Sequence, residues 1–341
     1  MRRSQMNFVS ALFLCFVVMV VGGSGSPRVG VGVSQDKHKK ERGSKDQIGS
    51  GKEGRPVLWT PRDNLESLDL FYGPGGRDGA PDLSGTFTYI GPDNKGTQKK
   101  IFVKDGRGRE WIVKFGPEAR PETAATRIVW AMGYHTDQDY FVEKVRIEGM
   151  PGGDALNVRF KRRHYGFKDA GLWSWEKNPF VGTRELDGLK VLMVLLNNWD
   201  LKYSNNKVVR PDKKSRDDPA ERIYYVGDLG ATFGKTGSLA QELHFPHNPR
   251  AGTKDRPDQY ASQSFIDGVH AGTVRFHYQG KDPGVLKGIP AANARWLGGM
   301  LARLSDAQLT QAFRAGGYNH SEVSILVQAI RKRITELQNV Q

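Results

Sequence analysis

The chain has 341 residues, of which 38% are hydrophobic and 26% are charged. This composition is typical of a soluble globular protein, and it excludes a polytopic membrane protein and a wholly disordered chain. The net charge of +14 favours anionic partners without choosing among nucleotides, nucleic acid, acidic lipid and acidic protein. The single cysteine, Cys15, excludes a disulfide framework and a cysteine-based zinc site.

Residues 1–26 have the form of a secretory signal peptide. Arg2 and Arg3 precede an apolar stretch at residues 8–21, and small residues follow up to Ser26. The stretch is shorter than the about 20 residues that a membrane span needs, so an uncleaved membrane anchor is the alternative. We expect a secreted or periplasmic protein, with membrane contact only if this segment is retained.

Residues 27–56 predict a flexible linker. They contain no aromatic residue and no apolar periodicity, so they cannot bury enough surface to offset the loss of chain entropy. From residue 57 the composition becomes globular. We therefore expect one domain at residues 57–341.

The first half of this domain reads as strands with one helix. Strands are expected at residues 85–90, 99–105, 110–115, 140–147 and 155–162. Between the third and fourth of them, a helix starts near Pro121, and Gly133 ends it. One face of this helix carries Glu122, Ala125, Val129 and Met132. These elements predict a small antiparallel sheet with one helix at about residues 84–163.

The second half, at about residues 164–341, is predicted to be mainly helical. Thr183 is the expected N-cap of a strongly apolar, buried helix that runs up to Asn197. Two terminal helices are expected to begin at the N-caps Ser305 and Ser321, with Gly316 and Gly317 as the break between them.

The loop after the buried helix contains the pattern D-x-K-x-x-N, formed by Asp200, Lys202 and Asn205. In phosphoryl transfer the aspartate of such a loop accepts the proton of the substrate hydroxyl, and the asparagine binds a metal ion. The lysine neutralises charge on the moving phosphoryl group. Carboxylate and amide oxygens are the ligands that Mg²⁺ prefers.

A hairpin is predicted to bring a second metal ligand to this loop. Residues 207–210 and 222–226 read as its two antiparallel strands, so Asn205 at one end and Asp228 at the other come close together. Asp228 begins the tripeptide Asp-Leu-Gly, which resembles the metal-binding Asp-Phe-Gly of kinases.

Four further positions suit a site for the phosphates of a nucleotide. Lys114 ends a predicted strand, and Glu122 at the start of the next helix can form the ion pair that orients it, with Glu118 as the competing partner. Lys114 could instead protect an exposed strand edge, and Glu122 could simply be a favourable acid at a helix N-terminus. Lys95 and Gly96, in a turn, are expected to cover the phosphates.

Together these motifs resemble those of the protein-kinase-like superfamily, nearer to atypical branches such as HipA-type and phosphoinositide-kinase-like enzymes. The resemblance spans about residues 84–341 and implies an α+β, two-lobed fold with ATP and Mg²⁺ or Mn²⁺ in the cleft. The sequence departs from the pattern in lacking the G-x-G-x-x-G and A-P-E motifs. The roles implied are Asp200 as base, Lys202 beside the phosphoryl group, Asn205 and Asp228 on the metal, and Lys114, Glu122, Lys95 and Gly96 with the nucleotide.

The resemblance implies an exported, ATP- and Mg²⁺-dependent phosphotransferase that acts on a hydroxyl of a protein, a lipid or a small molecule. The alternatives are a pseudokinase that binds nucleotide without turnover and a nucleotidyl transferase. No nucleic-acid partner is expected, because the basic cluster at residues 159–163 reads as a solvated strand edge without aromatic stacking residues.

Overall fold

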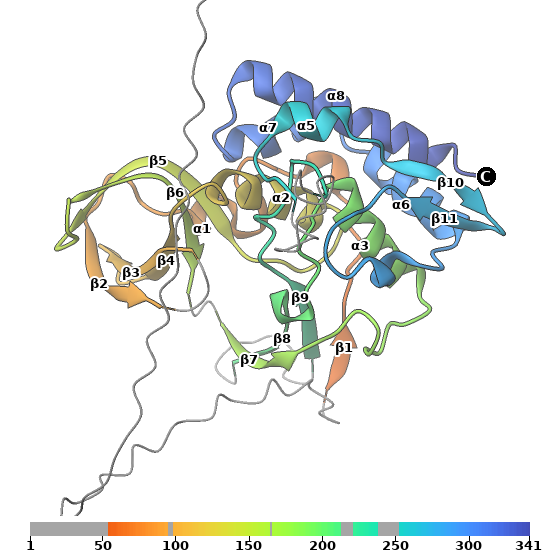
Figure 1. The fold of residues 1–341 in the computed structure, drawn as a ribbon. Coiled ribbons are helices and arrows are strands. Elements are labelled where there is room, and N and C mark those ends of the chain that lie inside the picture. The colour runs from red at the N-terminus through yellow and green to blue at the C-terminus, as the bar shows by residue number, and fades with distance from the viewer. Residues whose placement is uncertain (1–53, 95–97, 164–165, 213–220, 238–251) are drawn as a thin grey trace, which may run out of the picture. The chain divides into compact units, whose positions relative to one another are not determined.

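The computed structural model combines a closed strand barrel, a four-stranded sheet and a region rich in helices, which make an α+β fold (Figure 1). The predicted signal peptide, most of the predicted linker, Lys95 and Gly96 lie outside the described residues. No described helix has both the length and the apolar character needed to cross a bilayer. The described residues are 54–94, 98–163, 166–212, 221–237 and 252–341.

Five strands close into a barrel in the first part of the chain. The sequence predicted a small antiparallel sheet, which is wrong for one pairing, because Phe87 of the first strand pairs in parallel with Ile147 of the fourth and closes the barrel. These two strands are far apart in sequence, so no local pattern indicates the pairing. The barrel interior is apolar and includes Phe87, Trp111 and Phe160. In spatial order the strands are β2 (Phe87–Asp93), β3 (Lys100–Asp105), β4 (Glu110–Lys114), β6 (Asp154–Arg162) and β5 (Asp139–Glu148).

Helix α2 (Ala119–Ala131) connects β4 to β5. The predicted face of this helix is buried, since Glu122, Ala125, Val129 and Met132 are each at most 2% exposed. Gly133 ends the helix as predicted, with a φ of +88°. A Cβ atom there would lie 2.3 Å from the carbonyl oxygen of Thr60, so the position accepts only glycine.

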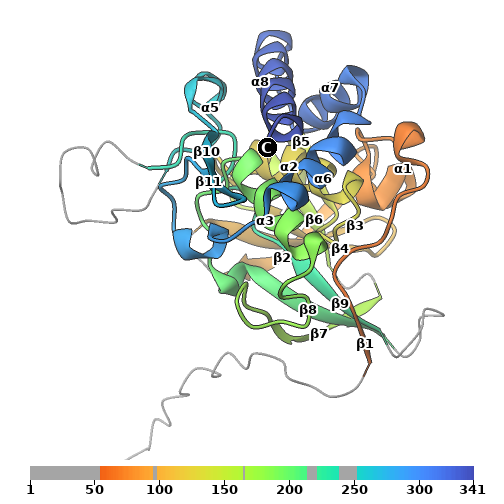
Figure 2. The same cartoon turned by 90° about the vertical axis from the view of Figure 1, so that its right-hand side faces the viewer.

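A four-stranded sheet carries the predicted hairpin. β8 (Asn206–Pro211) and β9 (Glu221–Val226) pair antiparallel, which confirms the hairpin. β1 (Arg55–Val57) pairs in parallel with β9. The sequence placed Arg55 and Pro56 in the flexible linker, whereas in the structure they belong to this strand. β7 (Phe167–Leu172) pairs with β8 on the other side and was not predicted. Figure 2 shows the four strands side by side.

The rest of the described chain is mainly helical and forms a second apolar core, separate from that of the barrel. Leu58, Leu65 and Leu70, which precede the barrel, pack into this core. The elements of this region are α3 (Arg184–Leu195), α5 (Pro257–Ser262), β10 (Ile266–His270), β11 (Thr273–Phe276), α6 (Ala291–Ala302), α7 (Asp306–Ala315) and α8 (His320–Gln338).

Two of the three predicted helix caps are confirmed. The Oγ1 of Thr183 accepts a hydrogen bond from the backbone N–H of Leu186, and Ser305 caps α7 in the same way. Ser321 is not a cap, because α8 begins earlier. Asn319 caps that helix and forms a capping box with Glu322, which satisfies two backbone N–H groups at once.

Candidate functional site

Six of the predicted site residues line one cavity of about 580 Å³: Lys114, Glu122, Asp200, Lys202, Asn205 and Asp228. Charged side chains dominate the cavity wall, with eight basic and six acidic residues. Such a wall suits phosphate groups and metal ions better than an apolar ligand. The basic residues are Lys100, Lys114, Arg159, Lys161, Lys202, Lys207, Lys254 and Lys281, and the acidic ones are Asp93, Glu118, Glu122, Asp137, Asp200 and Asp228.

Lys114 is held by carboxylates from two elements. Its Nζ lies 3.0 Å from Oε2 of Glu122 and 3.0 Å from Oδ1 of Asp228. Glu118, the competing partner in the sequence, also contacts it, at 2.5 Å. Burial opposes the charge of Lys114, but Glu122, Asp228 and Glu118 raise its pKa above the ordinary value.

The alternative reading of Lys114 is wrong. β4 lies between β3 and β6 in the closed barrel, so Lys114 is not at an exposed strand edge, and the residue is only 5% exposed. Glu122 does lie in the first turn of α2, as its alternative reading has it, but it is also 2% exposed and ion-paired with Lys114.

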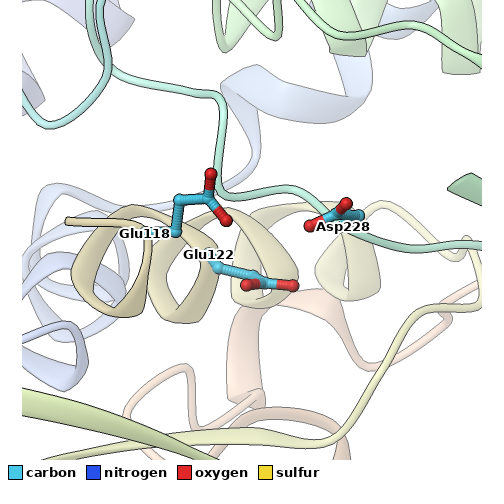
Figure 3. Close-up of side chains that lie close together, drawn as sticks. All are labelled: Glu118, Glu122 and Asp228. Carbon is cyan, nitrogen blue, oxygen red and sulfur yellow. The ribbon is translucent and has the colours of Figure 1, made fainter. Parts of the chain in front are cut away.

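Glu118, Glu122 and Asp228 form an acidic cluster whose carboxylate oxygens lie within 4.8 Å of one another (Figure 3). Glu118 and Glu122 project from the start of α2, and Asp228 approaches from the loop after β9. The ammonium group of Lys114 contacts all three side chains and neutralises part of their charge. The cluster therefore serves first as the binding site of this lysine.

Arg159 lies behind this cluster and is buried. Its Nη1 is 2.5 Å from Oε1 of Glu122 and 3.4 Å from Oδ1 of Asp139. The prediction of a solvated strand edge is wrong for this residue, because its side chain is 2% exposed and points into the site from β6. Burial raises the pKa of Asp139 to about 7. The nearby Arg159 opposes this change, and the negative charge of Glu122 adds to it.

Two further basic residues line the cavity. Lys161, which the sequence predicted to lie on a solvated strand edge, lies 3.1 Å from Oδ2 of Asp137 in the cavity wall. Lys207 of β8 was missed, and the nearby Asp137 carboxylate raises its pKa. Arg159 and Lys161 alternate along β6, so they face the same side of the strand. The spacing of Arg159 and Lys161 on a strand expected to lie beside Lys114 is the signal that could have placed both side chains at the site.

Asp200 is held by two lysines. Its Oδ2 lies 2.9 Å from Nζ of Lys202, and its Oδ1 lies 3.0 Å from Nζ of Lys281. The backbone N–H of Lys281 donates to the carbonyl of Trp199 at 2.8 Å, which fixes this second lysine beside the loop. Lys281 was missed because it is distant in sequence and carries no motif.

Asn205 and Asp228 lie close together through their backbones, as the hairpin predicted. The N–H of Gly227 donates to the carbonyl of Asn205 at 3.1 Å. The amide nitrogen of Asn205 donates to the carbonyl of Asp200 at 2.8 Å, which leaves the amide oxygen as a possible metal ligand.

Asp228 adopts a φ of +52°, a strained conformation for this residue type, and about half of its side chain is exposed. Burial opposes its ionisation, but Lys114 lowers its pKa below the ordinary value. One carboxylate and one amide oxygen beside an open cavity fit the hard-oxygen, partly hydrated coordination of Mg²⁺.

Replacing Arg159 by methionine is expected to lower the free energy of unfolding by about 3–5 kcal/mol, because the change leaves Glu122 and Asp139 buried without this cation. Urea denaturation of the purified protein measures the effect. The control is Arg163→Met, which removes a half-exposed ion pair with Glu110 and is expected to cost at most about 1 kcal/mol. Equal losses in the two variants would contradict the buried network.

Comparisons with known proteins find only distant structural likenesses among the matches reported. No family model and no curated protein matches the chain. Among solved structures it is similar to the Helicobacter pylori proinflammatory kinase CtkA, with 10% identity, a TM-score of 0.40, and coverage of 74% of this chain and 93% of that chain. It is also similar to the Rio2 kinase of Chaetomium thermophilum, with 12% identity, a TM-score of 0.27, and coverage of 73% of this chain and 72% of that chain.

Both of these proteins are kinases. The likeness is distant, so the functional argument rests on the geometry of the cavity.

Proposed function

We propose that this protein is an ATP- and Mg²⁺-dependent phosphotransferase that transfers a phosphoryl group to a hydroxyl. One observation carries the proposal: a buried lysine, held by Glu122 and Asp228, shares its cavity with Asp200, Lys202 and Asn205. The cavity thus combines a cation for phosphates, two oxygen ligands for a metal and a carboxylate for proton transfer.

Lys114 provides the positive charge for the nucleotide. Bound ATP with Mg²⁺ would supply the phosphoryl group and the means to neutralise its charge. In the structure Lys114 contacts Asp228, so nucleotide binding requires the lysine to exchange this carboxylate for the α- and β-phosphates. Glu122 holds the Nζ of Lys114 in place, and Asp228 and Asn205 would hold the metal.

Asp200 provides the base for the acceptor. It takes the proton of the hydroxyl as the acceptor oxygen forms its bond to phosphorus and the bond to the leaving diphosphate breaks. Lys202 and Lys281 each contact one of its oxygens, and each oxygen keeps a second lone pair that can accept the hydroxyl proton. Both lysines would lie close enough to neutralise charge on the transferred group.

Labelled ATP separates this proposal from its alternatives. The purified protein is incubated with Mg²⁺ or Mn²⁺ and with either γ-labelled or α-labelled ATP, in the presence of protein, lipid and small hydroxyl acceptors. Transfer of the γ-label alone supports a phosphotransferase. Transfer of the α-label identifies a nucleotidyl transferase, and binding without transfer of either label identifies a pseudokinase.

Replacing Asp228 by alanine is expected to abolish the metal-dependent part of the stabilisation by ATP. The variant loses one of the two metal ligands, and Asn205 alone is too weak a ligand for Mg²⁺. A thermal-shift titration with ATP, with and without Mg²⁺, measures this. The matched control is Asp154→Ala, at a carboxylate outside the cavity. An unchanged Mg²⁺ effect in Asp228→Ala would show that the metal binds elsewhere.

Export of the mature chain is part of the proposal. It is motivated by the basic start, the apolar stretch at residues 8–21 and the small residues up to Ser26. The intact mass of protein recovered from the exported fraction is expected to correspond to a chain that starts after the region of Ser26. A mass that includes Met1 would instead indicate a membrane anchor.

A further inference from the structure

A second cavity, of about 390 Å³, lies away from the charged one and shares none of its lining residues. It is bounded by the segment at residues 71–83, by β5, by α2 and by the end of α7. Most of its wall is apolar or aromatic: Phe71, Tyr72, Ala80, Pro81, Leu83, Tyr140, Phe141, Val142 and Ala315.

Arg127 of α2 lines this cavity and is 1% exposed. Among the described residues, no carboxylate lies within ion-pair distance of it, and its Nε makes no hydrogen bond. Its Nη1 donates to Oγ1 of Thr126 at 3.1 Å, and the guanidinium lies 5.4 Å from the centre of the Tyr140 ring. Burial lowers the pKa of Arg127 to about 10, with Asp139 and Tyr140 opposing the change.

A buried guanidinium without an anion is costly, because desolvation of the charge is not offset by a partner. Asp139 and Asp69 attract Arg127 from beyond ion-pair distance. Asp139 lies within ion-pair distance of Arg159, at 3.4 Å, and Asp69 accepts the backbone N–H groups of Phe71 and Tyr72 at 2.9 and 3.1 Å. The cavity therefore presents a buried positive charge that no described carboxylate contacts directly.

The other two arginines of the cavity are less available. Arg107 pairs with Asp82 at 3.1 Å, and the guanidinium of Arg77 lies 4.6 Å from the centre of the Tyr72 ring. Arg77 is exposed to solvent, so Arg127 is the one buried cation of this cavity wall without an anion among the described residues. One buried charge of this kind suits a ligand with one negative charge better than a phosphate monoester with nearly two.

Glycines in the 71–83 segment let its backbone lie directly against the two central side chains of the cavity. A Cβ atom at Gly73 would lie 3.1 Å from Nε of Arg127, and one at Gly75 would lie 1.9 Å from the hydroxyl oxygen of Tyr140. A side chain at either glycine would therefore displace Arg127 or Tyr140 from its place in the cavity wall. The volume falls within the about 300–1,000 Å³ of small-molecule sites.

We propose that this cavity binds a small carboxylate with an aromatic or short acyl body, whose carboxylate pairs with Arg127. A bidentate guanidinium–carboxylate contact compensates the buried charge, and the apolar body packs among Phe71, Leu83 and Tyr140. The proposal does not depend on the phosphotransferase function.

Benzoate and hexanoate are the probes, and calorimetry or ligand-observed NMR on the full chain measures their binding. We expect saturable binding of at least one of them, and at least about tenfold weaker binding of the neutral benzyl alcohol and of the Arg127→Met variant, since a charged hydrogen bond is lost. Phenyl phosphate is expected to bind no more tightly than benzoate.

A second pair of variants tests the location without touching Arg127. Leu83→Trp, at a half-exposed position of the cavity wall, is expected to block binding, whereas Leu156→Trp, equally exposed but outside the cavity, is expected to leave it unchanged. This pair of variants tests whether the ligand binds in this cavity even if Arg127→Met fails to fold. The proposal is overturned if neither carboxylate binds, if benzyl alcohol binds as well as benzoate, if phenyl phosphate binds more tightly, or if both tryptophan variants bind equally.

Discussion

Replacing Asp200 by asparagine is expected to lower turnover by about 100-fold or more while leaving nucleotide affinity close to that of the wild type. The asparagine keeps the size of the side chain but cannot take the proton of the acceptor hydroxyl. Nucleotide affinity is retained because Lys114, at the end of β4, makes the phosphate contacts in this mechanism. Calorimetry measures affinity, and release of labelled phosphate to the acceptor measures turnover.

The control for this variant is Asp154→Asn, which makes the same chemical change at a carboxylate that pairs with Lys144 outside the cavity. It is expected to retain full activity. Full activity in Asp200→Asn would show that another group is the base and that the catalytic loop has been misplaced.

Replacing Lys114 by methionine is expected to have two effects. Nucleotide affinity falls about tenfold or more, because the cation that contacts the phosphates is removed. The free energy of unfolding also falls, by about 3–5 kcal/mol, because three carboxylates within 4.8 Å of one another lose a shared cation. Calorimetry and urea denaturation measure the two quantities separately.

A double variant separates these two effects. Adding Glu118→Gln to Lys114→Met removes one of the repelling carboxylates, so part of the lost stability is expected to return. Nucleotide affinity is expected to stay low, because no cation has been restored. Recovery of nucleotide binding in the double variant would mean that Lys114 acts through the stability of the fold and makes no contact with phosphates.

Local patterns in the sequence were enough to predict most individual elements. The periodicity around Glu122 and Val129 predicted α2, and the two strand-like runs after Asn205 predicted the β8–β9 hairpin. Closure of the barrel and the pairing of β1 with β9 were not predictable in this way. Both depend on parallel contacts between segments far apart in the chain, which leave no local signature.

The candidate site was predictable where a short motif carried it. Lys114, Asp200 and Asp228 each belong to a recognisable pattern, and the structure places all three at one cavity. Arg159 was misread because a basic run on a strand usually faces solvent, whereas here Glu122 and Asp139 compensate its burial. Lys281 reaches Asp200 only through the tertiary fold.

The central claim is that the charged cavity holds Mg²⁺ and ATP with the phosphates at Lys114. A crystal structure with Mg²⁺ and a non-hydrolysable ATP analogue tests it most directly. We expect phosphate oxygens within hydrogen-bond distance of the Nζ of Lys114 and a metal ion bound by Asn205 and Asp228. A nucleotide bound outside this cavity, or a metal ion held by Glu118 and Glu122 with Lys114 displaced, would contradict the claim.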